Sequence, residues 1–322
     1  MTTPSAVRPD DIDLEPHRPA LTGHCYRMLG SPAEAEDAVQ ETMIRAWRNL
    51  DRFEGRSSLR TWLFRIATRV CLDMLEARER RAMPMDLGPA GDTEMTLVEL
   101  PASRWIEPIP DARALPADAT PEERAVLKEN IRLAFVAALQ HLTPRQRAVL
   151  LWTEVVGGTA AEIAEILATS VASVNSALQR ARATLATKDV SRGKGPLSEA
   201  QIALVDEYVR AFERYDMDAL TALLREDATM CMPPYTLWLR GPQAIRDWML
   251  GRGAACRDSR LVPTRACGAP AFGQYKPDPA GGPRKPWALI TLEFDGDAIS
   301  GLTYFLDTQA LFPLFGLPPE LP

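Results

Sequence analysis

The sequence predicts a multidomain chain, with two all-α helical domains followed by an α+β domain. Its 322 residues exceed what one small helical unit needs, so more than one hydrophobic core is expected. Apolar residues at helical spacing fill two stretches that a proline-rich segment separates, whereas alternating, aromatic-rich runs appear only after Leu197. The predicted domains are residues 17–81, 122–190 and 197–322, with a proline-rich acidic linker at 82–121.

The composition, with 46% hydrophobic and 25% charged residues, is typical of a globular protein, and no apolar run is long enough to span a membrane. The segment 1–15 lacks the apolar core of a secretory signal, so a cytoplasmic location is expected. The five cysteines are scattered, so no disulfide framework, metal site or cofactor is predicted. The net charge is −6, yet basic residues exceed acidic ones at 60–81 and 141–188, as local binding of a nucleic acid requires.

Ser31-Pro32 predicts the start of a helix, because serine caps helix N-termini and proline is favoured in the first turn. Its inward face is expected to hold Val39, Met43, Ala46 and Trp47. An acidic stripe follows the other face, formed by Glu36, Asp37, Gln40 and Glu41. The stripe suits docking on a basic partner, and a plain solvated face is the alternative.

The turn at 53–58 leads into a helix, predicted over 59–81, in which arginines and aromatic residues alternate. Bases stack on aromatic rings and arginines bind phosphates, so this pattern suits single-stranded DNA. Core packing is the alternative for Trp62 and Phe64, and their exposure decides between the two. In the linker that follows, Trp105 lies among prolines and acids, which predicts that it docks on a surface; a disordered tail is the alternative.

A helix-turn-helix is predicted between Leu142 and Leu185. Thr143-Pro144 marks a helix start, Gly157-Gly158 a stop, and Thr159 with Glu162 a capping box for the next helix. The inward face of the third helix is expected to hold Val174, Ala177, Leu178, Ala181 and Leu185. Its outward face carries side chains that read base edges and bind phosphates: Ser173, Asn175, Ser176, Gln179, Arg180 and Arg182. An ordinary three-helix packing unit is the alternative.

The last domain offers little catalytic chemistry. All three histidines precede Leu197, so no histidine dyad or histidine metal site can form within it. Asp206, Asp216 and Asp227 remain as isolated candidate bases, with caps or surface charges as the alternative. No catalytic residue is predicted, and the chain is not expected to be an enzyme. Large side chains that fit either a core or a pocket wall are Met230, Met232, Trp238, Trp248 and Tyr275.

Several motifs resemble a known family. The runs GSPAEAEDAVQET (30–42) and SLRTWLFRIA (58–67) resemble region 2 of bacterial sigma-70 family sigma factors of the extracytoplasmic-function group. LTPRQR (142–147), EIA (162–164) and SVNSALQRAR (173–182) resemble region 4. The run 105–111 resembles a linker motif of members with an extra C-terminal domain. The order of elements after Leu197 resembles the SnoaL-like cone fold, which encloses a pocket.

The resemblance implies a promoter-specificity subunit whose partners are core RNA polymerase and promoter DNA. Asp37, Gln40 and Glu41 would dock on the polymerase, and the outward face of the third helix would read the minus-thirty-five element. The melted minus-ten element would be captured, with a base flipped out, by Phe53, Arg56, Ser57, Arg60, Trp62, Arg65 and Arg69. Trp105, Glu107 and Asp111 would make linker contacts, and the acidic linker would follow a basic channel of the polymerase.

Two features depart from the family: Arg69 stands where asparagine is frequent, and the basic run is diluted at 76–81. Both bear on which promoter is recognised. The last domain would modulate initiation through a small-molecule ligand or an intramolecular contact. A second interpretation is a ligand-sensing helix-turn-helix regulator that acts without polymerase, which leaves the helix around Trp62 unexplained. A third is an isomerase or cyclase fused to a DNA-binding half, which requires Asp206 or Asp227 deep in an apolar pocket beside a tyrosine.

Overall fold

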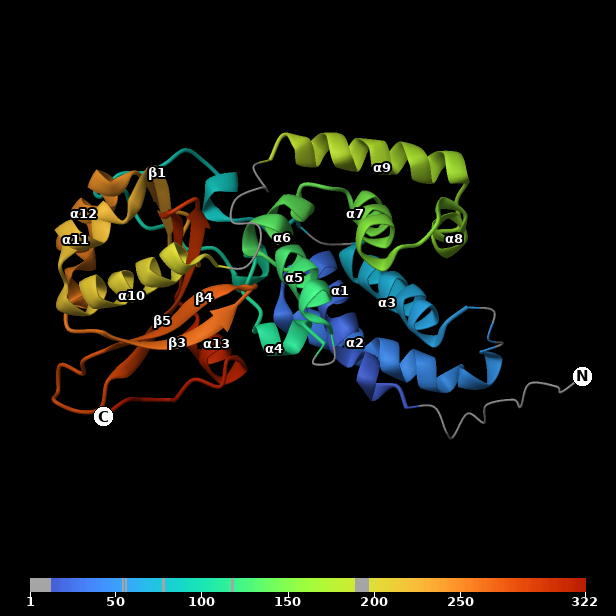
Figure 1. Cartoon of the computed structure of the whole chain (residues 1–322), viewed down its shortest axis with the longest axis horizontal. Helices are drawn as coiled ribbons and strands as arrows, with labels where there is room; N and C mark the ends of the chain where they lie inside the picture. Colours follow the sequence, from blue (N-terminus) through green and yellow to red (C-terminus); the bar gives the residue numbers. More distant parts are fainter. Residues whose placement is uncertain (1–12, 54, 56, 77–78, 117–118, 189–196) are drawn as a thin grey trace, which may run out of the picture. The chain divides into compact units, whose positions relative to one another are not determined.

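The computed structural model describes residues 13–53, 55, 57–76, 79–116, 119–188 and 197–322, so Arg56 of the predicted DNA-binding set lies outside the described residues. The chain divides into two compact units. The helical unit comprises residues up to Arg80 and Ala112–Lys188, and the sheet unit comprises Arg81–Asp111 and the residues after Asp189. The predicted fold class is confirmed, because helices build the first unit and a mixed sheet with helices builds the second (Figure 1).

Three mutually contacting helices open the helical unit: α1 (Arg18–Leu29), α2 (Pro32–Arg48) and α3 (Leu59–Leu75). α1 ends at Gly30, whose φ of 74° is a left-handed conformation that glycine adopts without strain. α3 begins at Ser58, whose hydroxyl accepts a hydrogen bond from the Thr61 amide. Both ends are therefore set by local side-chain and backbone chemistry.

The apolar face of α2 is narrower than the sequence pattern predicted. Its buried positions are Pro32, Ala35, Ala38, Val39, Thr42 and Ala46. Trp47 was expected to face inward, and that prediction is wrong, because 75% of its surface is exposed. Successive helical residues are rotated by about 100°, so Trp47 lies well away from Ala46 and close to the line of Gln40 and Ile44.

The second helical region contains α5 (Pro121–Asn130), α6 (Leu133–Gln140), α7 (Pro144–Leu151), a π-helical turn over Trp152–Val156, α8 (Ala160–Ile166) and α9 (Val171–Ala186), after the short α4 (Asp111–Ala114). The predicted N-cap at Thr143 and the predicted capping box of Thr159 with Glu162 are confirmed, and Thr143 also forms a capping box with Gln146. α9 contacts both α7 and α8 (Figure 1). The structure therefore contains the predicted helix-turn-helix.

Buried polar contacts join the two helical regions. The Thr68 hydroxyl of α3 donates to the Phe64 carbonyl oxygen at 2.8 Å and accepts from the Trp152 indole Nε1 at 2.8 Å. His24 Nε2 lies 2.9 Å from the same hydroxyl. Since the hydroxyl proton is already used, His24 must donate through Nε2, which leaves its buried Nδ1 unprotonated and without a partner. The joint between the two regions thus requires a neutral His24.

We expect acid to weaken this joint. Burial, and secondarily the charge of Arg27, lower the pKa of His24 from 6.5 to about 3. The unfolded chain therefore binds a proton between these pH values that the folded chain does not, so stability is full above pH 6.5 and falls as the pH drops toward 3. The loss approaches roughly 1.4 kcal/mol per pH unit. Urea unfolding at pH 7 and pH 5 should show it, and His24→Gln should remove that difference. An equal acid loss in this variant would contradict the assignment.

The sheet unit has a mixed six-stranded sheet in the order β2-β1-β6-β5-β4-β3. Its strands are β1 (Leu224–Cys231), β2 (Trp238–Arg240), β3 (Arg260–Ala266), β4 (Ala269–Lys276), β5 (Lys285–Asp295) and β6 (Ala298–Phe305). β1 and β6 are parallel, and the other neighbours are antiparallel. In register, Met230 lies opposite Leu302 of β6 and Leu239 of β2. The predicted runs at 287–294 and 299–305 are therefore strands.

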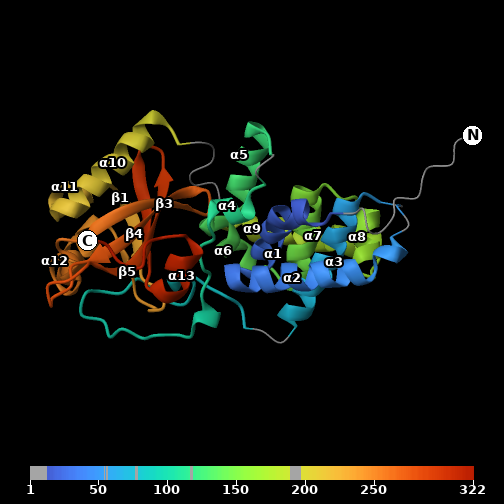
Figure 2. The same ribbon diagram turned by 90° about the horizontal axis from the view of Figure 1, so that it is seen from below.

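Helices α10 (Glu199–Arg214), α11 (Met217–Ala222) and α12 (Pro242–Leu250) contribute to one core with the sheet, and α13 (Thr308–Leu314) packs against β5 (Figure 2). Tyr208 and Phe212 of α10 are fully buried in this core, together with Ile290 and Leu292 of β5. Helix α11 ends at Ala222, because β1 begins at Leu224. In the described part of the chain, each helix is too short or too polar to cross a bilayer.

The segment 81–111 belongs to the sheet unit and crosses the connection between β1 and β2. Arg81 opens it, and its guanidinium donates to the carbonyl oxygens of Ala102 and Trp105. α3 consequently ends at Leu75, and the prediction that this helix continues to Arg81 is wrong. Three backbone amides then bond across the connection: Gly91 to Trp238 O at 2.8 Å, Thr236 to Val98 O at 2.9 Å, and Leu100 to Pro234 O at 3.0 Å.

Candidate functional site

The outward face of α9 is the first candidate surface. Ser170 caps the helix by accepting from the Ser173 amide, and the buried positions Val174, Ala177 and Ala181 orient the helix against α7 and α8. All six predicted reading residues lie on the side away from these three. Five of them are exposed and Ser176 is half-buried: Ser173, Asn175, Ser176, Gln179, Arg180 and Arg182. The face offers hydroxyl and amide groups near its start and cations toward its end.

Two hydrogen bonds pre-position the cations of α9. Arg180 Nη1 donates to Ser176 Oγ at 2.6 Å, one helical turn back. Arg182 donates to the Glu154 carboxylate of the π-helical turn at 2.5 and 3.1 Å. Both pairs are solvent-exposed, so they orient the guanidinium groups and contribute little stability. Arg180 keeps its full charge available, whereas Glu154 partly neutralises Arg182.

The outer side of α2 is the second candidate surface. Asp37, Gln40, Ile44 and Trp47 are spaced by three, four and three residues, so they form one exposed ridge. Glu41 lies beside the ridge and accepts from Arg45 Nε at 2.6 Å. Sequence reasoning found the polar members of the ridge and missed Ile44 and Trp47, although their spacing from Gln40 carried the signal. We call Asp37, Gln40, Ile44 and Trp47 the α2 ridge.

The third candidate surface is a hollow of about 430 Å³ beside α3. Trp62 is partly exposed in it and stacks at a tilt on Phe53, with 5.2 Å between ring centres. Phe64 is only 2% exposed and is a core residue, with the Arg60 guanidinium 5.5 Å from its ring centre. The two aromatics thus have different environments. The predicted residues that line the hollow are Phe53, Ser57, Trp62, Arg65 and Arg69.

Helix α8 forms the opposite wall of this hollow through Glu162, Glu165 and Ile166. Arg65 lies 3.5 Å from the Glu165 carboxylate, and Arg69 Nε donates to the Ile166 carbonyl oxygen at 3.4 Å. Two of the cations predicted to bind phosphates therefore contact oxygen atoms of the helix-turn-helix. The tertiary structure brings these groups together across about 100 residues of sequence, which no local pattern predicted.

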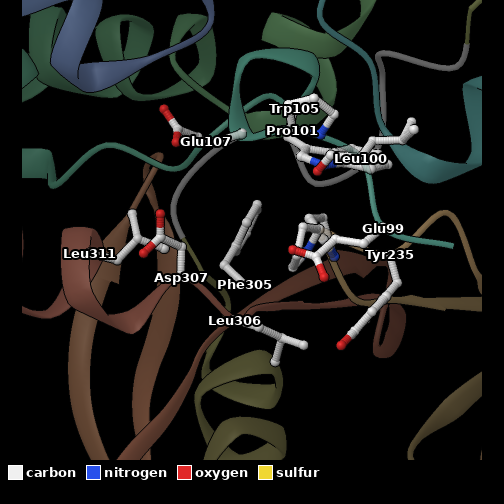
Figure 3. A pocket seen from close by; sticks show the side chains of 13 residues that line it. Glu99, Leu100, Pro101, Trp105, Glu107, Tyr235, Phe305, Leu306, Asp307 and Leu311 are labelled. Atoms are coloured by element: carbon white, nitrogen blue, oxygen red, sulfur yellow. The ribbon is translucent and has the colours of Figure 1, made fainter. Parts of the chain in front are cut away.

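The predicted linker residues lie against the sheet unit. Trp105 is 3% exposed, and its Nε1 donates to the Leu100 carbonyl oxygen at 3.1 Å. Asp111 accepts from the Gly268 amide at 2.7 Å and from Arg265 Nε at 3.2 Å. Glu107 lines a hollow of about 390 Å³. Figure 3 shows the carboxylates that line this hollow, those of Glu99, Glu107 and Asp307, around the Phe305 ring. The linker motif therefore docks within its own chain.

The three aspartates considered as bases have ordinary roles. Asp206 is exposed on α10, Asp216 caps α11 by accepting from the Ala219 amide, and Asp227 pairs with Arg225 at 2.8 Å. The large apolar candidates divide between core and cavity. Tyr275 is buried and donates to the Pro318 carbonyl oxygen, and the Trp238 indole donates to Gly88. The other three large apolar candidates line a cavity of the sheet unit, and they are Met230, Met232 and Trp248.

Family models match three parts of the chain. They are described as Sigma-70 region 2 (residues 14–81), Sigma-70 region 4 (residues 132–185) and SnoaL-like domain (residues 205–290). The α2 ridge and the α3 hollow lie within the first match and the α9 face within the second.

Whole proteins are also similar, two of them over most of this chain and one over half of it. The ECF RNA polymerase sigma factor SigG of Mycobacterium tuberculosis is 47% identical over 313 residues, which cover 95% of this chain and 83% of SigG. SigW of Bacillus subtilis, another ECF RNA polymerase sigma factor, is 30% identical over 50% of this chain and 78% of its own length. The crystal structure of the M. tuberculosis extracytoplasmic function sigma factor SigJ superposes with a TM-score of 0.60 and 22% identity, covering 94% of this chain and 97% of SigJ. The fold therefore extends across all three parts.

Proposed function

The chain belongs to the ECF RNA polymerase sigma factors, and on this basis we propose that it binds core RNA polymerase and directs promoter-specific initiation of transcription. The observation that supports this most directly is the α9 face, where Asn175, Gln179 and Arg180 are all exposed on the third helix of the helix-turn-helix. Amide side chains pair with adenine edges and arginine with guanine or phosphate. We propose that this face reads the minus-thirty-five element.

We propose that the α2 ridge docks on core polymerase. Its carboxylate and amide groups are exposed without serving the fold, and Trp47 adds a large apolar surface beside them. A tryptophan surrounded by polar side chains is a typical anchor of a protein–protein interface. Glu41, held by Arg45, lies at the edge of the ridge and extends its acidic character.

We propose that the α3 hollow captures the melted minus-ten strand. Trp62 and Phe53 supply ring faces for an unstacked base, and Arg65 and Arg69 on the wall supply cations for phosphates. The predicted Arg60 does not line the hollow and lies over the Phe64 ring instead. Since Glu165 pairs with Arg65 in this structure, the strand must displace α8 from the hollow to reach these cations.

For the last domain we propose ligand binding or regulation rather than catalysis. None of the three aspartates reaches the interior cavity, and the described cavity wall holds no acidic residue. Docking of the segment 81–111 on the same unit supports regulation in cis, because this segment connects the two promoter-binding regions. As a DNA-directed factor, the protein is proposed to act in the cytoplasm.

Run-off transcription with purified core polymerase tests the proposal. The chain should yield specific transcripts, and Asn175→Ala with Gln179→Ala should reduce them by roughly 30-fold or more, because the two lost base contacts cost about 1–3 kcal/mol each. Gln309→Ala on α13 is the matched control, because Gln309 is an exposed glutamine of the sheet unit. Core polymerase binding should stay unchanged in both variants. Operator binding by the chain in the absence of polymerase, with no transcripts, would instead support a simple helix-turn-helix regulator.

A further inference from the structure

The sheet unit encloses a cavity of about 290 Å³ between its sheet and α12, which we call the cone cavity. Its wall is rich in polarisable side chains: Met230, Met232, Trp248, Met249, Trp287 and Tyr304. Methionine and tryptophan adapt to flat apolar molecules. The volume is near the lower end of ligand pockets, at about 300 Å³, which suits a body of roughly two fused rings.

The charges along the cone cavity have one sign. Of the described residues that line it, the charged ones are Lys276 and Arg252, both cations. Arg252 is already engaged, because its Nη1 donates to the Met95 carbonyl oxygen at 2.7 Å and its guanidinium lies 5.2 Å from the Trp248 ring centre. Lys276 is half-buried, with Nζ 3.1 Å from the Trp287 ring centre. Burial lowers the pKa of Lys276, and the neighbouring Cys256 thiol only partly offsets this.

The wall of the cone cavity also supplies a neutral hydrogen-bond donor, the hydroxyl of Tyr304. The Tyr304 hydroxyl lies 3.2 Å from the Tyr208 hydroxyl, and both residues are buried. Burial raises the pKa of both phenols, so both stay protonated at neutral pH. The cavity thus combines apolar walls, a buried phenol pair and a cation without an acidic neighbour on the wall. A partly desolvated cation with no carboxylate beside it on the cavity wall favours an anionic ligand group.

We propose that the cone cavity binds a small aromatic acid, with its rings between the methionine and tryptophan side chains and its anionic group on Lys276. The segment 81–111 contributes Leu97 to the wall. A ligand in the cavity would therefore contact the segment that connects the two proposed promoter-binding regions. The inference concerns binding to the chain alone and holds or fails without reference to polymerase.

Isothermal titration calorimetry of the full chain with 2-naphthoate tests the proposal, with 2-naphthylmethanol and 2-naphthylmethylamine as neutral and cationic probes of the same ring system. We expect naphthoate to bind and the amine not to bind. K276Q should weaken naphthoate binding by about 10- to 100-fold, the effect of one charge-assisted hydrogen bond. K276R, which retains the charge, should restore most of the affinity.

Lys285→Gln is the matched control, because Lys285 is an exposed lysine of the neighbouring strand that pairs with Glu320 at 2.8 Å. It should leave naphthoate binding unchanged. Thermal unfolding of each variant separates a lost site from a misfolded unit. Equal binding of the acid and the alcohol, with K276Q unchanged, would overturn the anion assignment. Absence of binding by all three probes to folded protein would overturn the site.

Discussion

Replacing Trp152 with alanine is expected to lower the free energy of unfolding of the helical unit by about 3–5 kcal/mol. Trp152 is 1% exposed, and its ring fills the space beside Gly158, where an added Cβ would lie 2.9 Å from the ring. The substitution leaves a cavity and removes the donor that satisfies the Thr68 hydroxyl. Hydrogen–deuterium exchange of α1, α3 and α7 peptides measures the loss within the intact chain.

A second variant separates the two causes. Trp152→Phe keeps an aromatic ring but removes the Nε1 donor and a small part of the buried ring volume, so it should cost less than the alanine variant, about 1–2 kcal/mol. Protection of sheet-unit peptides should stay the same in both variants, since Trp152 belongs to the helical unit. Faster exchange throughout the chain would mean that the two units unfold together. Unchanged exchange in α1 and α3 would mean that Trp152 does not join the two helical regions.

Replacing Trp47 with alanine is expected to weaken the binding of core polymerase and to leave the stability of the chain unchanged. Because 75% of Trp47 is exposed, its loss should leave stability unchanged within about 0.5 kcal/mol. If Trp47 anchors the α2 ridge on core polymerase, the dissociation constant should rise by roughly 30-fold or more, as for an interface hot spot worth about 2 kcal/mol. Fluorescence anisotropy of the labelled chain titrated with core polymerase measures this.

Ile202→Ala is the control for Trp47→Ala, because Ile202 is a 52% exposed apolar residue on α10 of the sheet unit. It should leave polymerase affinity unchanged. A folded Trp47→Ala protein with wild-type affinity would remove the ridge from the interface, whereas Asp37 and Gln40 would remain candidates. Trp152 and Trp47 thus test two separate properties of the helical unit, packing for Trp152 and partner binding for Trp47.

The contact between α8 and the α3 hollow bears on how DNA enters. Glu165 lies where a phosphate would lie against Arg65, and Ile166 provides the oxygen atom that Arg69 contacts. The Arg65 pair is exposed on its acidic side and therefore weak, so displacement by a DNA strand costs little. In the proposed capture of the melted strand, a phosphate would replace the Glu165 carboxylate at Arg65.

The sequence by itself determined the features that depend on neighbours within one or two helical turns. Thr143-Pro144 and the capping box of Thr159 with Glu162 predicted two helix starts, because capping and first-turn preferences involve residues at most three positions apart. The six reading residues of α9 were correctly placed on its exposed side, because helical periodicity separates them from Val174 and Ala181. The three-part fold followed from the change of periodicity along the chain.

Only the tertiary structure decided which apolar residues were buried and which distant surfaces met. Trp47 and Trp152 have the same side chain, yet one is exposed and the other buried, because burial depends on whether another helix covers the position. The contact of Arg65 with Glu165, and the docking of Trp105 and Asp111 on the sheet unit, join residues that are far apart in sequence or lie in an irregular segment. Such contacts follow from chain folding in three dimensions, and no local spacing encodes them.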